Sequence, residues 1–132
     1  DSLIDLNVIA DIDYTTGKVK MPGHYAEYIW DTKKYLASQG KAYLNWIISG
    51  NKISASRSKN KALVFNYLEK LSKLYGFRLI DGMKDRVIYR ELFLEGLTVL
   101  DMQHPNLKLR MSMSHLAAKL EINNLAAFIS PE

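Results

Sequence analysis

The stretch DRVIYRELFLEGLTVLD, residues 85–101, predicts a short helix followed by an extended apolar run. Asp85 can cap the start of this helix, and Gly96 can adopt the left-handed backbone that commonly ends a helix. We expect a solvent-facing side made of Arg86, Arg90, Glu91 and Glu95, and an inward side made of Val87, Ile88, Tyr89, Leu92 and Phe93. Residues 97–100 then predict a buried strand or an extended arm.

The sequence on either side alternates between helical and strand patterns. Ser2 can cap an apolar helix over 3–10, and a polar excursion over 11–22 has a turn at 15–17. The remaining expected elements are helices over 24–38 and 54–75, strands over 43–48 and 77–80, and a last helix beginning near Ser112 or Ser114. The first of these strands does not strictly alternate, which is typical of a strand covered on both faces. The alternation predicts an α/β fold with a parallel sheet and right-handed crossovers.

Length and composition favour a globular chain that is one domain or a large part of one. The 132 residues include no cysteine, so neither disulfides nor thiolate chemistry are expected. No apolar run approaches the roughly 18 residues that a membrane span requires. No basic-then-apolar leader opens the chain. These features favour a cytoplasmic protein without a membrane partner.

Positive charge is concentrated in the middle of the chain. Residues 51–90 hold ten Lys or Arg against three Asp or Glu. Cations at the start of the 54–75 helix oppose its dipole by roughly 0.3–1 kcal/mol each, which favours an anionic partner such as DNA phosphate. The alternative is a solvated face with ion pairs, such as Arg90 with a nearby carboxylate. The candidate DNA contacts are Lys52, Arg57, Lys59, Lys61, Lys84, Arg86 and Arg90.

Two residues at predicted strand ends are candidates for small-molecule binding. Asn51 follows the 43–48 strand, and ligands of open α/β sheets bind at the carboxyl ends of the strands. Its carboxamide can read a purine edge, and the simpler alternative is that it caps a turn after Gly50. Gly82 follows the next strand and would allow a base or ribose to approach the backbone, unless it marks an ordinary turn.

Several familiar chemistries are missing from the sequence. No G-x-x-x-x-G-K-[ST] phosphate loop is present, and Gly17-Lys18 lacks its upstream glycine. The three histidines have no metal-ligand spacing, and His115 is expected to cap or pack. Trp30 and Trp46 are expected to be core or interface anchors.

Five blocks of sequence resemble the C-terminal half of ParA/MinD-type ATPases, and most closely the MipZ branch that positions the division plane in bacteria. They are Asp1-Ser2 with Asp5-Leu6, Tyr25 to Trp30 with Glu27, Asn45-Trp46 with Asn51, Arg86 to Phe93 with Gly96-Leu97-Thr98 and Leu100-Asp101, and Met111 to His115 with Ala117-Ala118. Lys119 stands where arginine is usual. The similarity runs nearly end to end.

The resemblance implies that residues 1–132 are the C-terminal portion of a single ATPase domain with a P-loop NTPase, Rossmann-like three-layer fold. The P-loop half, the Mg²⁺ ligands and the hydrolytic residues would lie upstream of Asp1, so this chain alone would not hydrolyse ATP. By the same resemblance Asn51 would contact the nucleotide base. Lys59 and Lys61 would lie in the family's DNA-binding stretch, although Ala62 and Leu63 stand where relatives often carry arginine.

The family also implies a biological setting. It predicts binding of ATP with Mg²⁺, ATP-driven homodimerisation, non-specific DNA binding on the nucleoid, and ParB-like and FtsZ-like partners. Cell-division placement is the expected role, with chromosome partitioning as the near neighbour. The alternative is a nucleic-acid or protein interaction module that has lost ATPase activity. Salt-dependent DNA binding without nucleotide affinity would favour that alternative.

Overall fold

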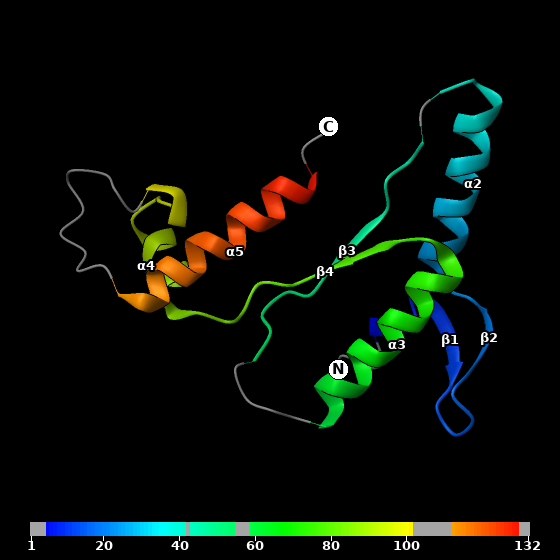
Figure 1. The fold of residues 1–132 in the computed structure, drawn as a ribbon, viewed down its shortest axis with the longest axis horizontal. Coiled ribbons are helices and arrows are strands. Elements are labelled where there is room, and N and C mark those ends of the chain that lie inside the picture. Colours follow the sequence, from blue (N-terminus) through cyan, green and yellow to red (C-terminus); the bar gives the residue numbers. More distant parts are fainter. Residues whose placement is uncertain (1–4, 42, 55–58, 102–111, 130–132) are drawn as a thin grey trace. The chain divides into compact units, whose positions relative to one another are not determined.

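The computed structural model describes residues 5–41, 43–54, 59–101 and 112–129. Its elements are, in order, β1 (Ala10–Asp13), β2 (Lys18–Pro22), α2 (His24–Ser38), β3 (Ile47–Ser49), α3 (Lys59–Tyr75), β4 (Arg78–Ile80), α4 (Val87–Leu94), the 3-10 helix η1 (Val99–Asp101) and α5 (Met113–Ile129) (Figure 1). The described part is therefore mixed α/β, as predicted. Its two-stranded sheets, β1–β2 and β3–β4, are compatible with part of a P-loop fold and do not by themselves make three layers.

The chain divides into two compact units. The first unit contains residues 1–48 and 57–79, and the second unit contains residues 49–56 and 80–132. Each unit has its own cluster of buried apolar side chains.

The first unit has a β-hairpin that begins at Ala10, where the sequence predicted the end of a helix. Residues 7–9 form a turn and Ala10 begins β1, so the helix predicted over 3–10 is wrong at its C-terminal end. The carbonyl of Ile9 accepts a hydrogen bond from the Gly23 amide at 2.8 Å, which draws the chain out of the helix. Strands β1 and β2 pair antiparallel, with an irregularity after Asp11.

The turn of this hairpin was predicted at the right place. Asp13 Oδ1 accepts hydrogen bonds from the amides of Thr15 at 2.9 Å and Thr16 at 3.3 Å. These bonds hold the pKa of the Asp13 carboxyl below its usual value. Gly17 then takes a φ of 70°, which a side chain would disfavour.

Helices α2 and α3 lie where the sequence predicted helices. Helix α2 spans the predicted residues, although Ala26 is buried while Tyr25 is exposed. The described part of α3 ends at Tyr75 before Gly76, and the predicted start of this helix falls partly on residues 55–58, outside the described residues. The core of the first unit consists of Leu6, Ile9, Ala10, Ile12, Tyr67, Leu68, Leu71 and Phe77.

Strand β3 is shorter and more exposed than predicted. It covers only Ile47–Ser49, and Tyr43, which was predicted to begin it, is 77% exposed. The expectation of a strand covered on both faces is therefore wrong for the described residues. Strand β4 forms as predicted and pairs with β3, and the Arg78 amide donates to the carbonyl of Trp46, just before β3, at 2.8 Å.

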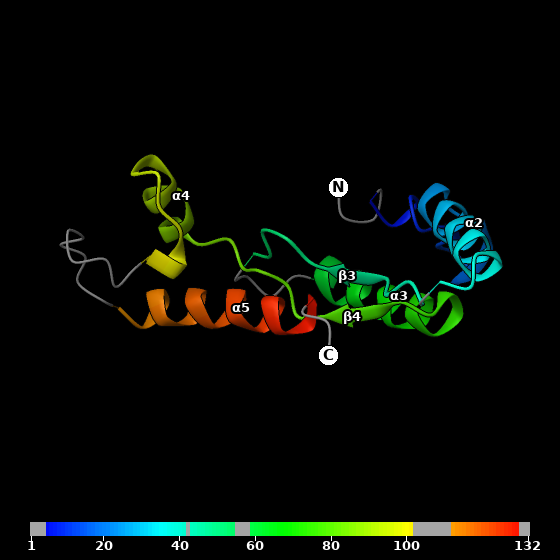
Figure 2. The same ribbon diagram turned by 90° about the horizontal axis from the view of Figure 1, so that it is seen from above.

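The second unit brings α4 and η1 against α5 (Figure 2). Its core consists of Ile88, Leu92, Val99 and Ala118. Val87 and Phe93, which were expected to face inward, are 58% and 80% exposed. The inward face of α4 is therefore narrower than its apolar sequence predicted.

Both ends of the 85–101 stretch need correction. Arg86, and not Asp85, occupies the N-cap position of α4, and the Asp85 carboxylate pairs with Arg90. The buried strand or arm predicted at 97–100 is wrong, since Val99–Asp101 form a 3-10 helix. Asp101 Oδ2 accepts hydrogen bonds from both the amide and the hydroxyl of Thr98 at 2.8 Å, and these bonds favour the tight backbone turn of the 3-10 helix. Gly96 ends α4 with a φ of 68°, as predicted.

Helix α5 begins where the sequence placed it. The Ser112 hydroxyl oxygen accepts from the His115 amide at 3.4 Å, and His115 Nδ1 accepts from the Ser112 amide at 3.0 Å. This reciprocal cap confirms the capping role expected of His115. Among the described residues, no helix combines the length and apolarity needed to cross a membrane.

Candidate functional site

The two loops that follow β3 and β4 are joined through their backbones in the second unit. The Met83 amide donates to the Gly50 carbonyl at 3.0 Å, and the Ile53 amide donates to the Met83 carbonyl at 3.0 Å. The Asp85 amide donates to the Ile53 carbonyl at 2.9 Å, next to a parallel bridge between Ile53 and Lys84. We call residues 50–53 and 82–85 the loop pair. It brings Asn51, which follows β3, and Gly82, which follows β4, to the same edge of the β3–β4 sheet.

Asn51 is exposed in the first of these loops. Its Oδ1 accepts a hydrogen bond from the Lys52 amide at 2.9 Å, while Lys52 has a left-handed φ of 51°. The bond supports the turn, as the simpler sequence interpretation expected. With its oxygen engaged in this way, the carboxamide presents nitrogen donors to a ligand.

Gly82 has a packing role in the second loop. A Cβ built at this position would lie 2.3 Å from the Gly50 carbonyl oxygen and 2.5 Å from Ile53 Cδ1. Only glycine allows the two loop backbones to approach this closely. Gly82 is half-buried. The close approach that it permits is therefore between the two loops of this chain, before any approach of a ligand.

The predicted DNA contacts fall in both units. Lys59 and Lys61 begin the described part of α3 in the first unit, where Lys59 is exposed and Lys61 is half-buried. Lys52 and Lys84 are exposed on the loop pair. Arg57 lies outside the described residues.

Two of the predicted DNA contacts form ion pairs with carboxylates of this chain. Arg90 Nη1 lies 2.7 Å from Asp85 Oδ1, and both side chains are at least half exposed. Arg86 Nη2 lies 2.6 Å from Glu121 Oε1, and these side chains are only 16% and 17% exposed. The ion pair anticipated for Arg90 is therefore present, and Arg86 has a more protected one.

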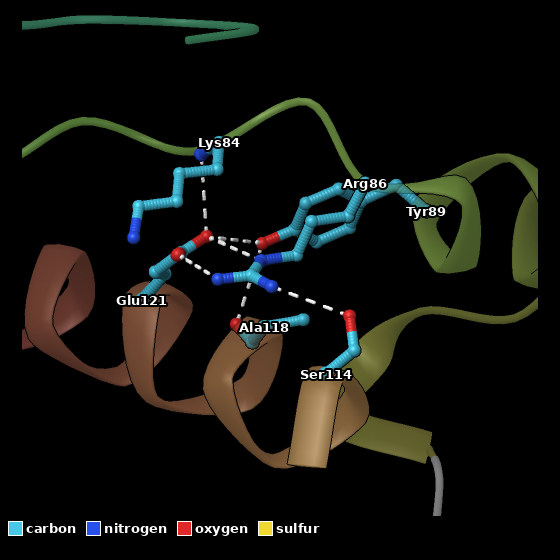
Figure 3. A network of polar contacts seen from close by, with 6 residues as sticks. All are labelled: Lys84, Arg86, Tyr89, Ser114, Ala118 and Glu121. Carbon is cyan, nitrogen blue, oxygen red and sulfur yellow. Dashed lines mark hydrogen bonds and ion pairs between the residues drawn. The ribbon is translucent and has the colours of Figure 1, made fainter. Parts of the chain in front are cut away.

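Glu121 is the centre of a polar cluster between α5 and residues 84–89 (Figure 3). Its Oε2 accepts from the Lys84 amide at 3.3 Å and from Arg86 Nε at 3.3 Å, and lies 3.1 Å from the Tyr89 hydroxyl. Arg86 Nη1 also donates to the Ser114 hydroxyl at 3.3 Å. One carboxylate thereby holds both the backbone before α4 and two side chains at its start.

The cluster changes the proton affinities of its members. Partial burial would raise the pKa of Glu121, but hydrogen bonds from Arg86, the Lys84 amide and Tyr89 outweigh it and hold that pKa below its ordinary value. Burial first, and then the hydrogen bond to the Glu121 carboxylate, raises the pKa of Tyr89 to about 12. The hydrogen bond to Glu121 likewise raises the pKa of Arg86. Glu121 is therefore an anion and Arg86 a cation at neutral pH.

The sequence interpretation missed Glu121. It is the only acidic residue in α5, Met113–Ile129, and a lone carboxylate in an apolar helix is the signal that could have drawn attention to it. Its partner Arg86 is 35 residues away, so sequence spacing gave no indication of the pairing. Ser114, Ala118 and Glu121 share one helical face at spacings of three and four residues.

The first unit contains a separate apolar cleft of about 320 Å³. It is lined mainly by Trp30, Trp46, Leu74 and Tyr75, with Lys33 among its few charged members. Trp46 also packs against Phe77, with ring centroids 5.0 Å apart, as expected of a core anchor. Trp30 is 61% exposed, so it is not a core residue of this unit. Of the predicted nucleotide and DNA contacts that the structure describes, none lines the cleft.

Magnesium, which the sequence resemblance implies, finds no fitting donor set in the part of the chain that is described. No group of three or more His, Asp or Glu side chains lies close enough there to hold a metal ion. Carboxylates are the protein ligands that Mg²⁺ prefers. The described residues therefore provide no set of side chains that fits a bound Mg²⁺.

These observations first define a class: an α/β chain whose loops after neighbouring strands meet at one edge, compatible with part of a P-loop nucleotide-binding fold. The sequence model of the family described as ATPase MipZ matches residues 1–130. The chain therefore belongs to the MipZ ATPase family, which confirms the resemblance. No curated protein sequence matches it.

Proposed function

We propose that residues 1–132 are the C-terminal portion of a MipZ-like ATPase domain that binds ATP, dimerises, binds DNA without sequence specificity and regulates division-site placement. The family match over residues 1–130 carries this proposal. The P-loop, the Mg²⁺ ligands and the hydrolytic residues then belong to sequence upstream of Asp1. Chromosome partitioning is the neighbouring role within the same ATPase group.

The loop pair supplies the structural support for base binding. Asn51 is exposed on a turn that follows β3, and backbone hydrogen bonds fix that turn to the loop after β4. An adenine contacted here would meet amide donors from Asn51, with Gly82 keeping the second loop close. Triphosphate binding would come from the upstream half.

The proposal is tested by nucleotide binding to the complete gene product, measured by calorimetry with Mg²⁺ present. We expect Asn51→Ala to weaken ATP binding about tenfold, the effect of losing roughly one hydrogen bond to a ligand. Asn66→Ala, which changes an exposed asparagine of α3, is the matched control and leaves the affinity unchanged. A complete protein that binds no ATP would overturn the ATPase assignment and favour an interaction module.

DNA binding is proposed for the exposed lysines of the predicted set. Lys52, Lys59 and Lys84 are exposed, whereas the charge of Arg86 is paired with Glu121. Replacing a lysine that contacts phosphate lowers the slope of log affinity against log salt by about 1. We expect this change for Lys59→Ala in duplex DNA titrations, and not for the exposed Lys41→Ala. Equal slopes in both variants would remove Lys59 from the interface.

The setting proposed with this activity is the cytoplasmic nucleoid. An ATP-bound homodimer would be the DNA-binding form, and ParB-like and FtsZ-like proteins would be its partners. Co-sedimentation of the complete protein with FtsZ-like filaments, with and without ATP, tests the division role. A protein that responds to the ParB-like partner alone would point to chromosome partitioning.

A further inference from the structure

The carboxylate of Glu121 accepts hydrogen bonds from a segment far from it in sequence. Its donors in the described part of the chain all lie within residues 84–89, and they include one backbone amide, one guanidinium and one phenol. The side chain is 17% exposed, which limits competition from water. A charged acceptor of this kind forms stronger hydrogen bonds than a neutral one.

The segment around Lys84, which Glu121 holds, is also hydrogen-bonded to the turn that carries Asn51. Lys84, whose amide donates to Glu121, forms the parallel bridge with Ile53. The neighbouring residues Met83 and Asp85 exchange backbone hydrogen bonds with residues 50–53. A continuous path of bonds therefore runs from α5 through the Lys84 segment to the Asn51 turn.

We propose that Glu121 is a positioning residue for base binding: from α5 it fixes the Lys84 segment, and through it the turn that presents Asn51. The inference rests on the function proposed above, because the base would bind at that turn. Glu121 itself does not contact the nucleotide. Its contribution is to hold the loop pair in one arrangement before ligand arrives, which lowers the ordering cost of binding.

The geometry favours a glutamate at this position over its closest substitutes. Two oxygens are used at once, with Oε1 on Arg86 and Oε2 on the Lys84 amide, Arg86 and Tyr89. A glutamine would keep one acceptor oxygen but would direct an NH₂ group at a donor. An alanine would remove every bond while leaving α5 a good helix former.

The first experiment follows the loop pair directly and needs no nucleotide. Amide hydrogen exchange is measured in the complete protein for wild type, Glu121→Ala and Glu121→Gln, with Glu91→Gln as an exposed carboxylate control in the same unit. We expect exchange at Lys84, Ile53 and Met83 to rise about tenfold in Glu121→Ala and less in Glu121→Gln. Unchanged exchange at Ile53 and Met83 would break the path and overturn the inference.

The second experiment separates positioning from general stability. Affinities for ATP and for inorganic tripolyphosphate are compared, because tripolyphosphate has no base to be read. We expect Glu121→Ala to weaken ATP binding about 5- to 20-fold and tripolyphosphate binding less than about twofold. An equal loss of affinity for both ligands would show that Glu121 has a merely structural role. Unchanged ATP affinity would show that Glu121 has no role in base binding. Glu121→Gln, which preserves side-chain volume, decides the outcome if the alanine variant does not fold.

The two experiments also distinguish this inference from the proposed function. Wild-type protein that binds tripolyphosphate but does not prefer ATP would refute base reading at Asn51, and positioning for base binding would fail with it. Wild-type protein that binds ATP, with Asn51→Ala impaired and Glu121→Ala not, would refute the inference and leave the proposed function intact.

Discussion

The two units are stabilised by different physical means. Among the described residues, the core cluster of the first unit contains eight buried side chains, and none of them is charged. The described core cluster of the second unit has four buried side chains, and this unit adds the polar cluster around Glu121, in which an ion pair is largely shielded from water. The first unit therefore depends on packed volume, whereas the second also depends on hydrogen-bond geometry and protonation. The second unit is also the one that carries the candidate base-binding edge.

The largest effect is expected in the packed core of the first unit. Leu71 is 1% exposed, so Leu71→Ala should lower the free energy of unfolding by about 3 kcal/mol, through lost burial and a residual cavity. Leu74, one turn away in α3 and 59% exposed, is the matched control, with an expected loss below about 1 kcal/mol. Urea unfolding measures both. Equal losses would mean that the core does not centre on Leu71.

The next effect is expected in the polar cluster of the second unit. Arg86→Ala leaves the Glu121 carboxylate without its main partner, which should cost about 2–3 kcal/mol because the side chains are largely shielded from water. Arg90→Ala breaks an exposed pair and should cost less than about 1 kcal/mol. A double-mutant cycle with Glu121→Ala measures the coupling. Coupling close to zero would show that the cluster does not stabilise the second unit.

Local sequence patterns predicted the elements that depend on local interactions. The range of α2, the end of α3 at Tyr75 and the stop after α4 at Gly96 were predicted correctly, because helix patterns and glycine act over a few residues. The resemblance to the MipZ branch also held over nearly the whole chain.

Features that depend on distant or competing contacts were not predictable in this way. The pairing of Arg86 with Glu121 joins residues 35 positions apart. The 3-10 helix at Val99–Asp101 follows from side-chain bonds between Thr98 and Asp101 that an apolar pattern does not encode. Periodicity gave the apolar residues of α4 but not the width of its covered face, so the exposure of Phe93 was missed.

A smaller effect is expected from the protonation of Tyr89. Its folded-state pKa of about 12 lies above the ordinary 10.0, so the protonated phenol stabilises the folded state. That contribution is full below about pH 10 and is lost as pH rises toward about 12, by about 1–2 kcal/mol after allowance for partial exposure. Tyr89→Phe should remove this part of the alkaline decline.

The measurement compares unfolding free energies of wild type and Tyr89→Phe at about pH 9 and about pH 11.5. Tyr14 and Tyr75 of the first unit also have raised pKa values, mainly through burial, so only the difference between the two proteins reports on Tyr89. A difference that does not change with pH would show that the phenol is not held by the Glu121 cluster.

The smallest effect is expected for the exposed ion pair of the first unit. Lys34 Nζ lies 3.3 Å from Asp31 Oδ1, and the two side chains are 63% and 75% exposed. Water screens such a pair, so Lys34→Ala should change the free energy of unfolding by less than about 0.5 kcal/mol. This loss should be several times smaller than that of Arg86→Ala, although the Arg86 pair is the shorter by less than 1 Å. If Lys34→Ala proved as costly as Arg86→Ala, shielding from water would not be what separates the two units.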